Sequence, residues 1–304
     1  MTSTNQIFCY KITSESAPGY FCDFEIQTKV YLQILCKEIE GHLLLFYNRL
    51  NKMASPSEKA ALLDMCRNRV KNYAESKYNF NEYFRGKEAF PEYYKAAVLV
   101  PVFVKEGSLR VLLTLRSEQL PTHKGQVAFP GGKQEDCDKD IVDTALREAH
   151  EEVGLPPDSV EVVAVLSPLV AKVRDKNMYV YPVIGIIKSQ FDLDINTSEV
   201  QTTFDVPLEF FLLKDTYSLD TIIFRGREIE VHSFDYTTND EDQKQTKSSR
   251  FFIWGLTATV CLKVAITALN KLPEFKLHER YSELMQYITE LNSQESGLKP
   301  LSKI

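Results

Sequence analysis

The sequence predicts a layered domain of the α/β (α+β) class, and three observations carry this prediction. Hydrophobic residues make up 44% of the chain and charged residues 26%, a balance typical of soluble globular proteins. Its 304 residues suffice for one large domain, or for one domain with an appendage. From about Tyr93 onward, short β-branched runs alternate with segments of helical periodicity, and this mixed order indicates a layered architecture.

Residues 1–52 are expected to form an N-terminal extension of unknown role. Val30 to Leu50 has apolar residues at three- and four-residue steps, which predicts a helix, whereas the segment before it has no clear period. Two interpretations stay open. The extension is either dispensable for chemistry, even an artefact of the gene model, or a real regulatory or docking segment.

A helical lead-in is expected over residues 53–91. Ser55 fits an N-cap, Pro56 the first helical position, and Glu58 the residue that completes a capping box. The main domain is then expected over residues 92–292, followed by a tail over residues 293–304.

The main domain opens with predicted strands. The runs Ala96 to Val104 and Val111 to Leu115 predict a hairpin around a Glu106-Gly107 turn. A further short strand is expected at Gln126 to Phe129.

A helix is predicted from Ile141 to Val153, because Gly154 follows at the position that favours a left-handed C-cap. The elements expected after it are strands Val160 to Leu166 and Met178 to Ile187, a short helix Pro207 to Leu213, a hairpin of Thr221 to Phe224 with Glu228 to Tyr236, a helix Gly255 to Leu272 and an amphipathic helix Arg280 to Leu291.

Three carboxylates share one face of the central helix. Glu148, Glu151 and Glu152 stand at i, i+3 and i+4, so they project from the same side and repel one another. Carboxylate oxygens without thiol or imidazole ligands suit hard ions such as Mg²⁺ or Mn²⁺. The alternative is an ordinary solvated acidic face.

Phe129-Pro130-Gly131-Gly132-Lys133 precedes this helix. Two consecutive glycines let the backbone approach a ligand or an adjacent helix closely. A glycine loop that leads into a helix with metal-type carboxylates is typical of a site for a pyrophosphate and a metal.

The segment resembles the Nudix box. Gly132, Asp138 and the run Arg147-Glu148-Ala149-His150-Glu151-Glu152-Val153-Gly154-Leu155 carry the resemblance. The general pattern has Glu where Asp138 stands, and one residue fewer before the arginine. The resemblance implies a Nudix-like α/β/α sandwich with a mixed sheet, in which Glu148, Glu151 and Glu152 bind Mg²⁺ or Mn²⁺ and Arg147 orients a carboxylate by ion pairing.

A second block resembles the coenzyme A diphosphatase branch of that family. Leu112-Leu113-Thr114-Leu115-Arg116-Ser117 is followed by Leu120, His123, Gly125 and Val127, and runs directly into the box. The resemblance implies that substrate contacts come from Arg116, Ser117, His123, Gly131 and Gly132. Other roles stay open: a structural ion pair for Arg116, a turn cap for Ser117, a surface position for His123, and backbone permissiveness for the glycines.

The general base is expected among Glu151, Glu152 and Glu199, with the two box glutamates first. Glu199 also has a structural interpretation, as a favourable charge at the start of a helix. The implied reaction is hydrolysis of coenzyme A or acyl-coenzyme A to 3′,5′-ADP and 4′-phosphopantetheine. The alternatives are a Nudix enzyme for another nucleoside diphosphate derivative, such as ADP-ribose or NADH, and a noncatalytic Nudix binding module.

Charge and composition narrow the partners and the compartment. A net charge of -6 argues against a general nucleic-acid binder. No apolar run approaches the ~20 residues needed to span a bilayer, so we expect no membrane partner. Six scattered cysteines and the lack of a secretory signal in Met1 to Tyr10 indicate an intracellular protein with reduced thiols.

The final residues Ser302-Lys303-Ile304 resemble the Ser-Lys-Leu peroxisomal address, with Ile in place of Leu. They predict a peroxisomal protein recognised by an import receptor. The alternative is an accidental tail on a cytoplasmic protein.

Overall fold

A computed structural model describes residues 55–79, 94–173, 176–188, 192–224, 227–238 and 249–297. The expected extension over residues 1–52, with its helix at Val30 to Leu50, lies outside the described residues. So does the tripeptide Ser302-Lys303-Ile304. The residues from Ala54 onward belong to one unit.

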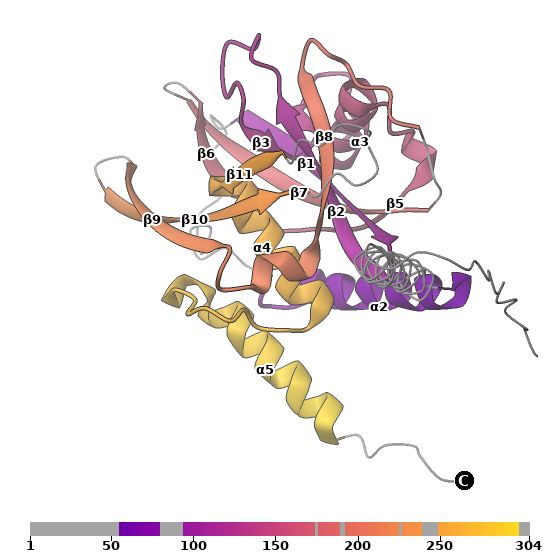
Figure 1. The fold of residues 1–304 in the computed structure, drawn as a ribbon, viewed down its shortest axis with the longest axis vertical. Helices are drawn as coiled ribbons and strands as arrows, with labels where there is room; N and C mark the ends of the chain where they lie inside the picture. The colour runs from indigo at the N-terminus through magenta and orange to yellow at the C-terminus, as the bar shows by residue number, and fades with distance from the viewer. Residues whose placement is uncertain are drawn as a thin grey trace, which may run out of the picture. The chain divides into compact units, whose positions relative to one another are not determined.

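The main sheet is mixed, as expected (Figure 1). Its central strand β1 (Tyr94–Lys105) runs parallel to β7 (Lys176–Ile187) on one side and antiparallel to β2 (Ser108–Arg116) on the other. Within the described residues the sheet is completed by β3 (Val127–Ala128), β4 (Gly131–Lys133), β5 (Val160–Val165), β6 (Leu169–Val173) and β8 (Val200–Pro207).

The β1–β2 hairpin is confirmed. Its turn residues Glu106 and Gly107 have φ angles of 53° and 73°. Two successive positive φ angles are typical of the tight turn whose twist matches that of the flanking strands. The turn sets Lys105 opposite Ser108, so the register of the hairpin follows from local sequence.

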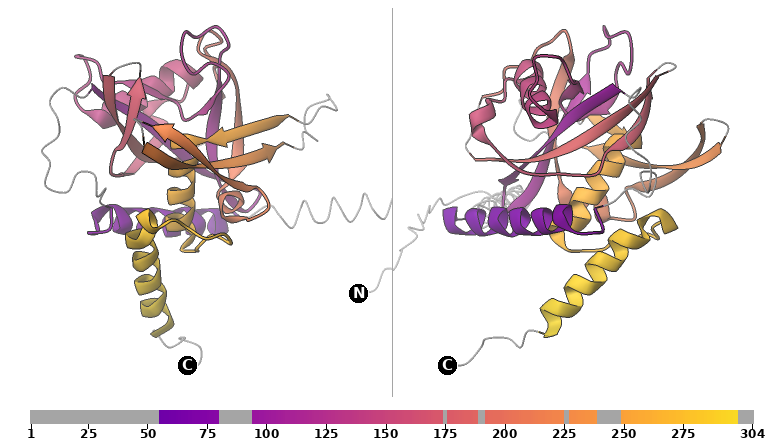
Figure 2. Two further views of the ribbon diagram at one scale, coloured as in Figure 1. Left: turned by 90° about the vertical axis from the view of Figure 1, so that its left-hand side faces the viewer. Right: turned by 180° about the vertical axis from the view of Figure 1, so that it is seen from behind.

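Side chains of β1 alternate between two cores. Ala97 and Leu99 pack with Ala149 of helix α3 (Ile141–Val153). Val100 and Val102 belong to the larger core, which includes helix α4 (Gly255–Leu269). Because successive residues of a strand point to opposite faces, α3 and α4 cover opposite sides of the sheet (Figure 2). The arrangement is a helix–sheet–helix sandwich.

Helix α3 begins and ends where the sequence predicts. The side chain of Asp140 accepts hydrogen bonds from the amides of Val142 and Asp143, which caps the N-terminus. Gly154 adopts the left-handed conformation at φ 72° and closes the C-terminus. The position of the acidic helix is therefore fixed by signals on either side of it.

Helix α2 (Pro56–Glu75) begins with the expected capping box, in which Ser55 and Glu58 exchange hydrogen bonds. Arg67 donates two hydrogen bonds to Glu161 of β5, at 2.6 and 2.8 Å. Tyr73 packs edge to face on Tyr287 of helix α5 (Ser282–Gly297). The lead-in helix thus contacts the same body as the sheet.

A second, three-stranded antiparallel sheet consists of β9 (Tyr217–Phe224), β10 (Arg227–Thr237) and β11 (Arg250–Trp254). Phe234 and Ile253 are paired across it and buried in the larger core. Three short 3₁₀ turns, Pro157–Ser159, Leu208–Leu212 and Glu279–Tyr281, join neighbouring elements. No helix in the described part of the chain is long and apolar enough to cross a membrane.

Some expected elements differ from the structure. The predicted helix over Pro207 to Leu213 is a 3₁₀ turn, and the helix from Gly255 ends at Leu269 because Asn270 turns left-handed at φ 52°. The glycine loop is strand β4, which pairs with Ala96–Val98 of β1. Glu199 precedes strand β8 and no helix, so its interpretation as a helix-start charge is wrong.

Candidate active site

Strand β4 and helix α3 meet closely at Gly132. A Cβ atom built on Gly132 would lie 2.2 Å from Oε1 of Glu148, far inside van der Waals contact. Any larger residue here would push the Glu148 carboxylate away. Two glycines can let the backbone approach either a ligand or an adjacent helix. At Gly132 the structure shows the approach of an adjacent helix.

Glu152 lies inside the site and is 2% exposed. Its Oε2 accepts a hydrogen bond from the amide of Gly131 at 3.2 Å, and its Oε1 lies 3.6 Å from Nη1 of Arg116. Burial raises the pKa of Glu152 to about 8, against the opposing effects of Arg116 and the Gly131 amide. The negative charges of Glu148 and Glu199 raise it further.

Glu148 stands one turn before Glu152 and shares its environment. Its side chain is 14% exposed, and Nη1 of Arg147 lies 3.1 Å from Oε1. Burial raises the pKa of Glu148, Arg147 lowers it, and the charges of Glu151 and Glu199 raise it again. Two carboxylates with raised pKa values, one buried and one partly buried, form a site that a cation would stabilise.

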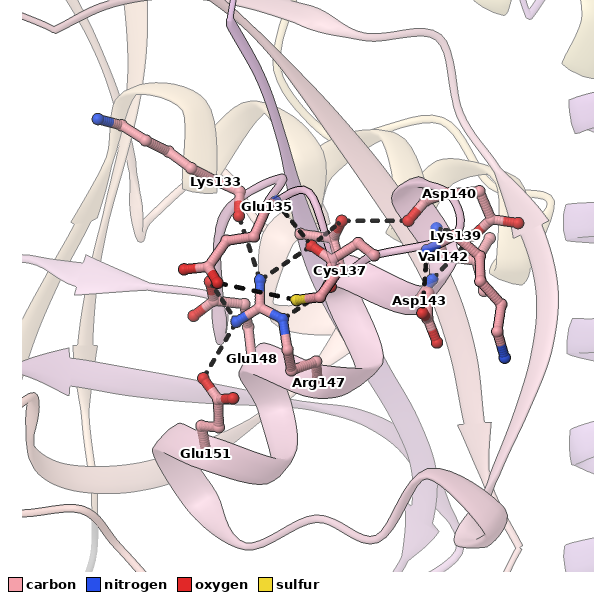
Figure 3. Close-up of polar contacts among 12 residues, drawn as sticks. Lys133, Glu135, Cys137, Lys139, Asp140, Val142, Asp143, Arg147, Glu148 and Glu151 are labelled. Carbon is pink, nitrogen blue, oxygen red and sulfur yellow. Dashed lines mark hydrogen bonds and ion pairs between the residues drawn. The ribbon is translucent and has the colours of Figure 1, made fainter.

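Arg147 is held on several sides (Figure 3). Its Nε and Nη2 donate to the two oxygens of Asp138 at 2.8 and 3.0 Å, Nη1 donates to Glu151 at 3.1 Å, and Nη2 also donates to the Lys133 carbonyl. The expected orienting role of Arg147 is therefore compatible with its geometry. The guanidinium ties the loop after β4 to the acidic helix.

Asp138 is the residue at which the box departs from the general pattern. It is 2% exposed, and it also accepts hydrogen bonds from the Thr144 hydroxyl and the Glu135 amide, both at 2.9 Å. The hydrogen bonds from Arg147 are the main cause that holds its pKa well below the usual range. The shorter side chain still reaches Arg147 and receives a two-pronged hydrogen bond from it.

Glu151 differs from the other two box glutamates, because its side chain is 55% exposed and pairs with Arg147. The carboxylates of Glu148 and Glu152 contact β4 at Gly132 and Gly131. Glu151, by contrast, extends from α3 toward Arg147 and is largely exposed (Figure 3).

Glu199 reaches the site from a distant part of the chain. Its carbonyl accepts a hydrogen bond from the amide of Ser117 at 2.8 Å, and Val200 pairs with Arg116. The charge of Glu199 acts on both Glu148 and Glu152. Three carboxylates from two elements therefore share this side of α3.

Arg116 ends strand β2, where the pairing with β8 shifts register between Leu115 and Arg116. Such irregularities re-aim a side chain. Its Nε is buried and has no hydrogen-bond partner among the described residues. An unpaired buried donor costs about 1–3 kcal/mol. The structural ion pair considered for Arg116 is present, but it leaves the guanidinium incompletely bound.

The remaining expected substrate contacts lie in the loop between β2 and β3. Ser117 is 5% exposed, and its hydroxyl accepts a hydrogen bond from the Gln119 amide, which fits the turn-cap interpretation. His123 is exposed and its ring contacts Gln126 at 3.0 Å, which fits a surface position. Gly125 has a φ of 64°, so it serves the backbone of this loop.

The donor set fits a hard divalent cation. Glu148, Glu151 and Glu152 offer carboxylate oxygens alone, the ligand type preferred by Mg²⁺ and Mn²⁺, and Glu199 adds a further carboxylate nearby. Within the described ranges, no three Asp, Glu, His or Cys side chains already converge on one point. The contacts above explain this, since Gly131 and Arg116 engage Glu152 while Arg147 engages Glu148 and Glu151.

An open cavity of about 450 Å³ lies beside Lys133 and the loop that follows β4. Its lining combines an aromatic ring, two lysines, an amide and three carboxylates, from Tyr94, Lys95, Lys133, Gln134, Glu135, Asp136 and Asp138. Lys133 also lies over the Tyr94 ring, 5.8 Å from its centre.

Sequence reasoning missed two features of this site. The loose ion pair of Arg116 with Glu152 joins residues from different elements, and no spacing in the sequence indicates it. The second is the network of Asp138 with Thr144 and Glu135. The run of Asp138 and Asp140 before the helix was the available signal for it, since acidic side chains favour helix N-termini.

Comparisons with known proteins give the family. The model of the NUDIX domain matches residues 93–218. Nudix hydrolase 15, mitochondrial, of Arabidopsis thaliana is 42% identical over 184 residues, which are 60% of this chain and 61% of that protein. Nudix hydrolase 22, chloroplastic, of the same plant is 39% identical over 216 residues, 69% of this chain and 67% of that protein.

A mouse (Mus musculus) protein named peroxisomal coenzyme A diphosphatase NUDT7 is 39% identical over 183 residues, 60% of this chain and 74% of that protein. This chain spans about three fifths of the length of Nudix hydrolase 15 of Arabidopsis thaliana. The stretch matched by the NUDIX model, residues 93–218, includes β4, α3 and the residues that meet there. The chain belongs to the Nudix hydrolase family.

Proposed function

We propose that this protein hydrolyses the pyrophosphate bond of coenzyme A or its derivatives, in a reaction that depends on Mg²⁺ or Mn²⁺. The products would be 3′,5′-ADP and 4′-phosphopantetheine. The observation that carries the proposal is the group formed by Glu148, Glu152, Glu199 and Arg116, which come from three separate segments to the edge of β4.

Carboxylates and one guanidinium suit this chemistry. Hydrolysis of a phosphate anhydride needs positioning of the phosphates and neutralisation of their charge more than it needs a covalent nucleophile. In the proposal, Glu148, Glu151 and Glu152 hold the cation, which supplies charge neutralisation and an activated water when bound. Arg147 keeps Glu148 and Glu151 in place through its hydrogen bonds to Asp138.

The remaining residues act on the substrate in this proposal. Arg116 and the backbone at Gly131 and Gly132 bind the diphosphate, with Ser117 and His123 in the loop beside it. Glu151, Glu152 or Glu199 accepts the proton of the attacking water. Glu199 is a candidate for this last role because its negative charge contributes to the raised pKa values of Glu148 and Glu152.

The choice of coenzyme A has two supports. One is the block Leu112 to Ser117 with its continuation to Gly132, which resembles the coenzyme A diphosphatase branch. The other is the 39% identity to a relative named as a coenzyme A diphosphatase. The other relatives are named only as Nudix hydrolases, so the substrate is a proposal in its own right.

A comparison of specificity constants tests the substrate. Purified protein is assayed with Mg²⁺ or Mn²⁺ on coenzyme A and on ADP-ribose, and the two kcat/KM values are compared. We expect coenzyme A to be preferred and to inhibit ADP-ribose cleavage competitively. Preference for ADP-ribose, with no competition by coenzyme A, would keep the Nudix chemistry and refute the proposed substrate.

Import into peroxisomes is a separate proposal that rests on Ser302-Lys303-Ile304 and its recognition by an import receptor. The names of the relatives point to peroxisome, mitochondrion and chloroplast in turn. A fluorescent fusion that keeps the natural C-terminus should enter peroxisomes, and removal of the three residues should leave it in the cytosol. Unchanged import after the deletion would contradict the proposal.

A further inference from the structure

Two arginines contact the carboxylates of the site, and they are held very differently. Arg147 donates hydrogen bonds to Asp138, Glu151 and the Lys133 carbonyl, so its guanidinium is fixed. Arg116 makes only a loose contact with Glu152, since 3.6 Å exceeds the 2.7–3.2 Å of a normal hydrogen bond. Its Nε has no partner within the described residues.

Glu152 is the point at which this loose contact matters. One oxygen of Glu152 accepts the Gly131 amide, and the other faces Nη1 of Arg116. A cation that binds to Glu152 through the second oxygen would approach the guanidinium directly. An arginine cannot lose its charge in a protein, so this repulsion can be relieved only by movement of Arg116.

Arg116 has the freedom to move. Its main chain is anchored, because its amide donates to the Gln126 carbonyl and its own carbonyl accepts from the Gly125 amide. Its side chain is 22% exposed, so the guanidinium has a path toward the open side of the site. A guanidinium with an unpaired Nε can present two parallel donors to a phosphate.

We propose that Arg116 exchanges partners during binding: it pairs with Glu152 while the metal is absent, and divalent-cation binding at Glu152 releases it to bind a diphosphate. The inference rests on the proposed function of this site. It makes Arg116 a positioning residue for the metal ligand and a ligand of the substrate in turn.

The exchange couples two binding events. The metal must displace Arg116, which weakens metal binding on its own, and a diphosphate that captures Arg116 removes that penalty. By linkage, the diphosphate strengthens metal binding by the same factor by which the metal strengthens diphosphate binding. Part of this coupling comes from direct contact between metal and phosphate, and the remainder should pass through Arg116.

The test measures binding rather than catalysis. Calorimetric titration of the full chain gives the Kd for Mn²⁺ alone. It also gives the Kd for methylenediphosphonate with and without saturating Mn²⁺, after correction for the complex that Mn²⁺ and the diphosphonate form with each other in solution. The ratio of the two diphosphonate constants is the coupling factor. Wild type is compared with Arg116→Gln, Arg116→Lys and the control Arg110→Gln.

Arg110 is a matched control because it lies on the same strand, about 20 Å away at 3.3 Å per residue, and pairs with Asp205. We expect Arg116→Gln to bind Mn²⁺ about five- to tenfold more tightly than wild type and to lose at least about fivefold of the coupling factor. Arg110→Gln should match wild type in both.

Arg116→Lys separates the effect of partner exchange from the effect of the positive charge alone. The variant also remains informative if Arg116→Gln does not fold. Lysine keeps the positive charge but cannot present the planar fork. We expect its Mn²⁺ affinity to stay near wild type while the coupling factor falls.

Two results would overturn the exchange. One is equal tightening of Mn²⁺ binding by Arg116→Gln and Arg110→Gln, which would reveal only a change in net charge. The other is an unchanged coupling factor in both Arg116 variants. Failure of the proposed function would give a different result. A wild-type protein that shows the coupling but leaves coenzyme A intact would contradict coenzyme A as the substrate, while the partner exchange of Arg116 would stand.

Discussion

The carboxylate of Glu148 occupies the space that a side chain at Gly132 would fill. A Cβ on Gly132 would meet three atoms of this carboxylate at 2.2, 2.4 and 2.7 Å. Gly132→Ala should therefore displace Glu148 while the fold survives, since the end of a flexible side chain can shift. We expect a loss of about 10- to 100-fold in kcat/KM, the scale typical of misplaced metal-ligand support, with little change in the free energy of unfolding.

Gly131 provides the contrast within the same strand. A Cβ there would lie 2.4 Å from the Ala97 carbonyl and 2.6 Å from Cα of Val98, and backbone atoms cannot move aside. Gly131→Ala should lower the free energy of unfolding by roughly 1–3 kcal/mol or more. Urea denaturation of both variants checks the pair, and a Gly132→Ala protein as unstable as Gly131→Ala would contradict the assignment.

Asp138→Asn tests the anchor of Arg147. The substitution keeps the size of a side chain that is 2% exposed but removes the charge that accepts both hydrogen bonds from Arg147. Hydrogen bonds to charged groups contribute about 1.5–3 kcal/mol, so we expect a destabilisation of that order together with reduced turnover. The exposed neighbour Asp136→Asn is the control and should stay within about 0.5 kcal/mol of wild type. Equal stability of the two variants would show that Arg147 does not depend on Asp138.

The limits of sequence-based prediction follow from where the signals lie. Helix α3 lies where the sequence predicts a helix, because Gly154 and the helical pattern are adjacent in sequence, and the Asp140 cap fixes its start. The Ser55 capping box is local in the same way. Each of these features depends on residues within one or two turns of each other.

Features that depend on distant pairing could not be predicted. Strand β4 forms because Gly131–Lys133 pairs with Ala96–Val98 of β1. Strand β8 forms because Val200–Pro207 pairs with β2. The sequence placed Glu148, Glu151 and Glu152 on one side of a helix, but their different burial depends on β4. The approach of Glu199 and Arg116 required the tertiary structure.

The Arg67–Glu161 pair between α2 and β5 predicts a pH-dependent contribution to stability. Hydrogen bonds from Arg67 lower the pKa of Glu161 in the folded protein. The stabilisation is therefore present above the unfolded value of about 4.5 and is lost as the pH falls through the lower folded value. Both side chains are about one third exposed, so solvent screening limits the contribution of the pair to the free energy of unfolding to about 0.5–1 kcal/mol.

Glu161→Gln reveals this contribution as a difference. The free energy of unfolding of the variant, measured in urea, should fall below that of wild type at pH 7, and the gap should shrink as the pH falls below about 4.5. A gap that persists unchanged at acid pH would show that the pair stabilises the protein by packing rather than by charge.

The most direct test of the central claim is product analysis with wild-type protein and Glu152→Gln. The variant keeps the shape of a buried side chain and should fold, which its thermal unfolding can verify. With coenzyme A and Mg²⁺ or Mn²⁺, wild type should release 3′,5′-ADP and 4′-phosphopantetheine, EDTA should stop the reaction, and Glu152→Gln should lose at least about 100-fold in rate, the scale on which removal of one electrostatic group acts. A folded Glu152→Gln protein with near wild-type turnover, or a wild-type protein that releases neither product, would contradict the account.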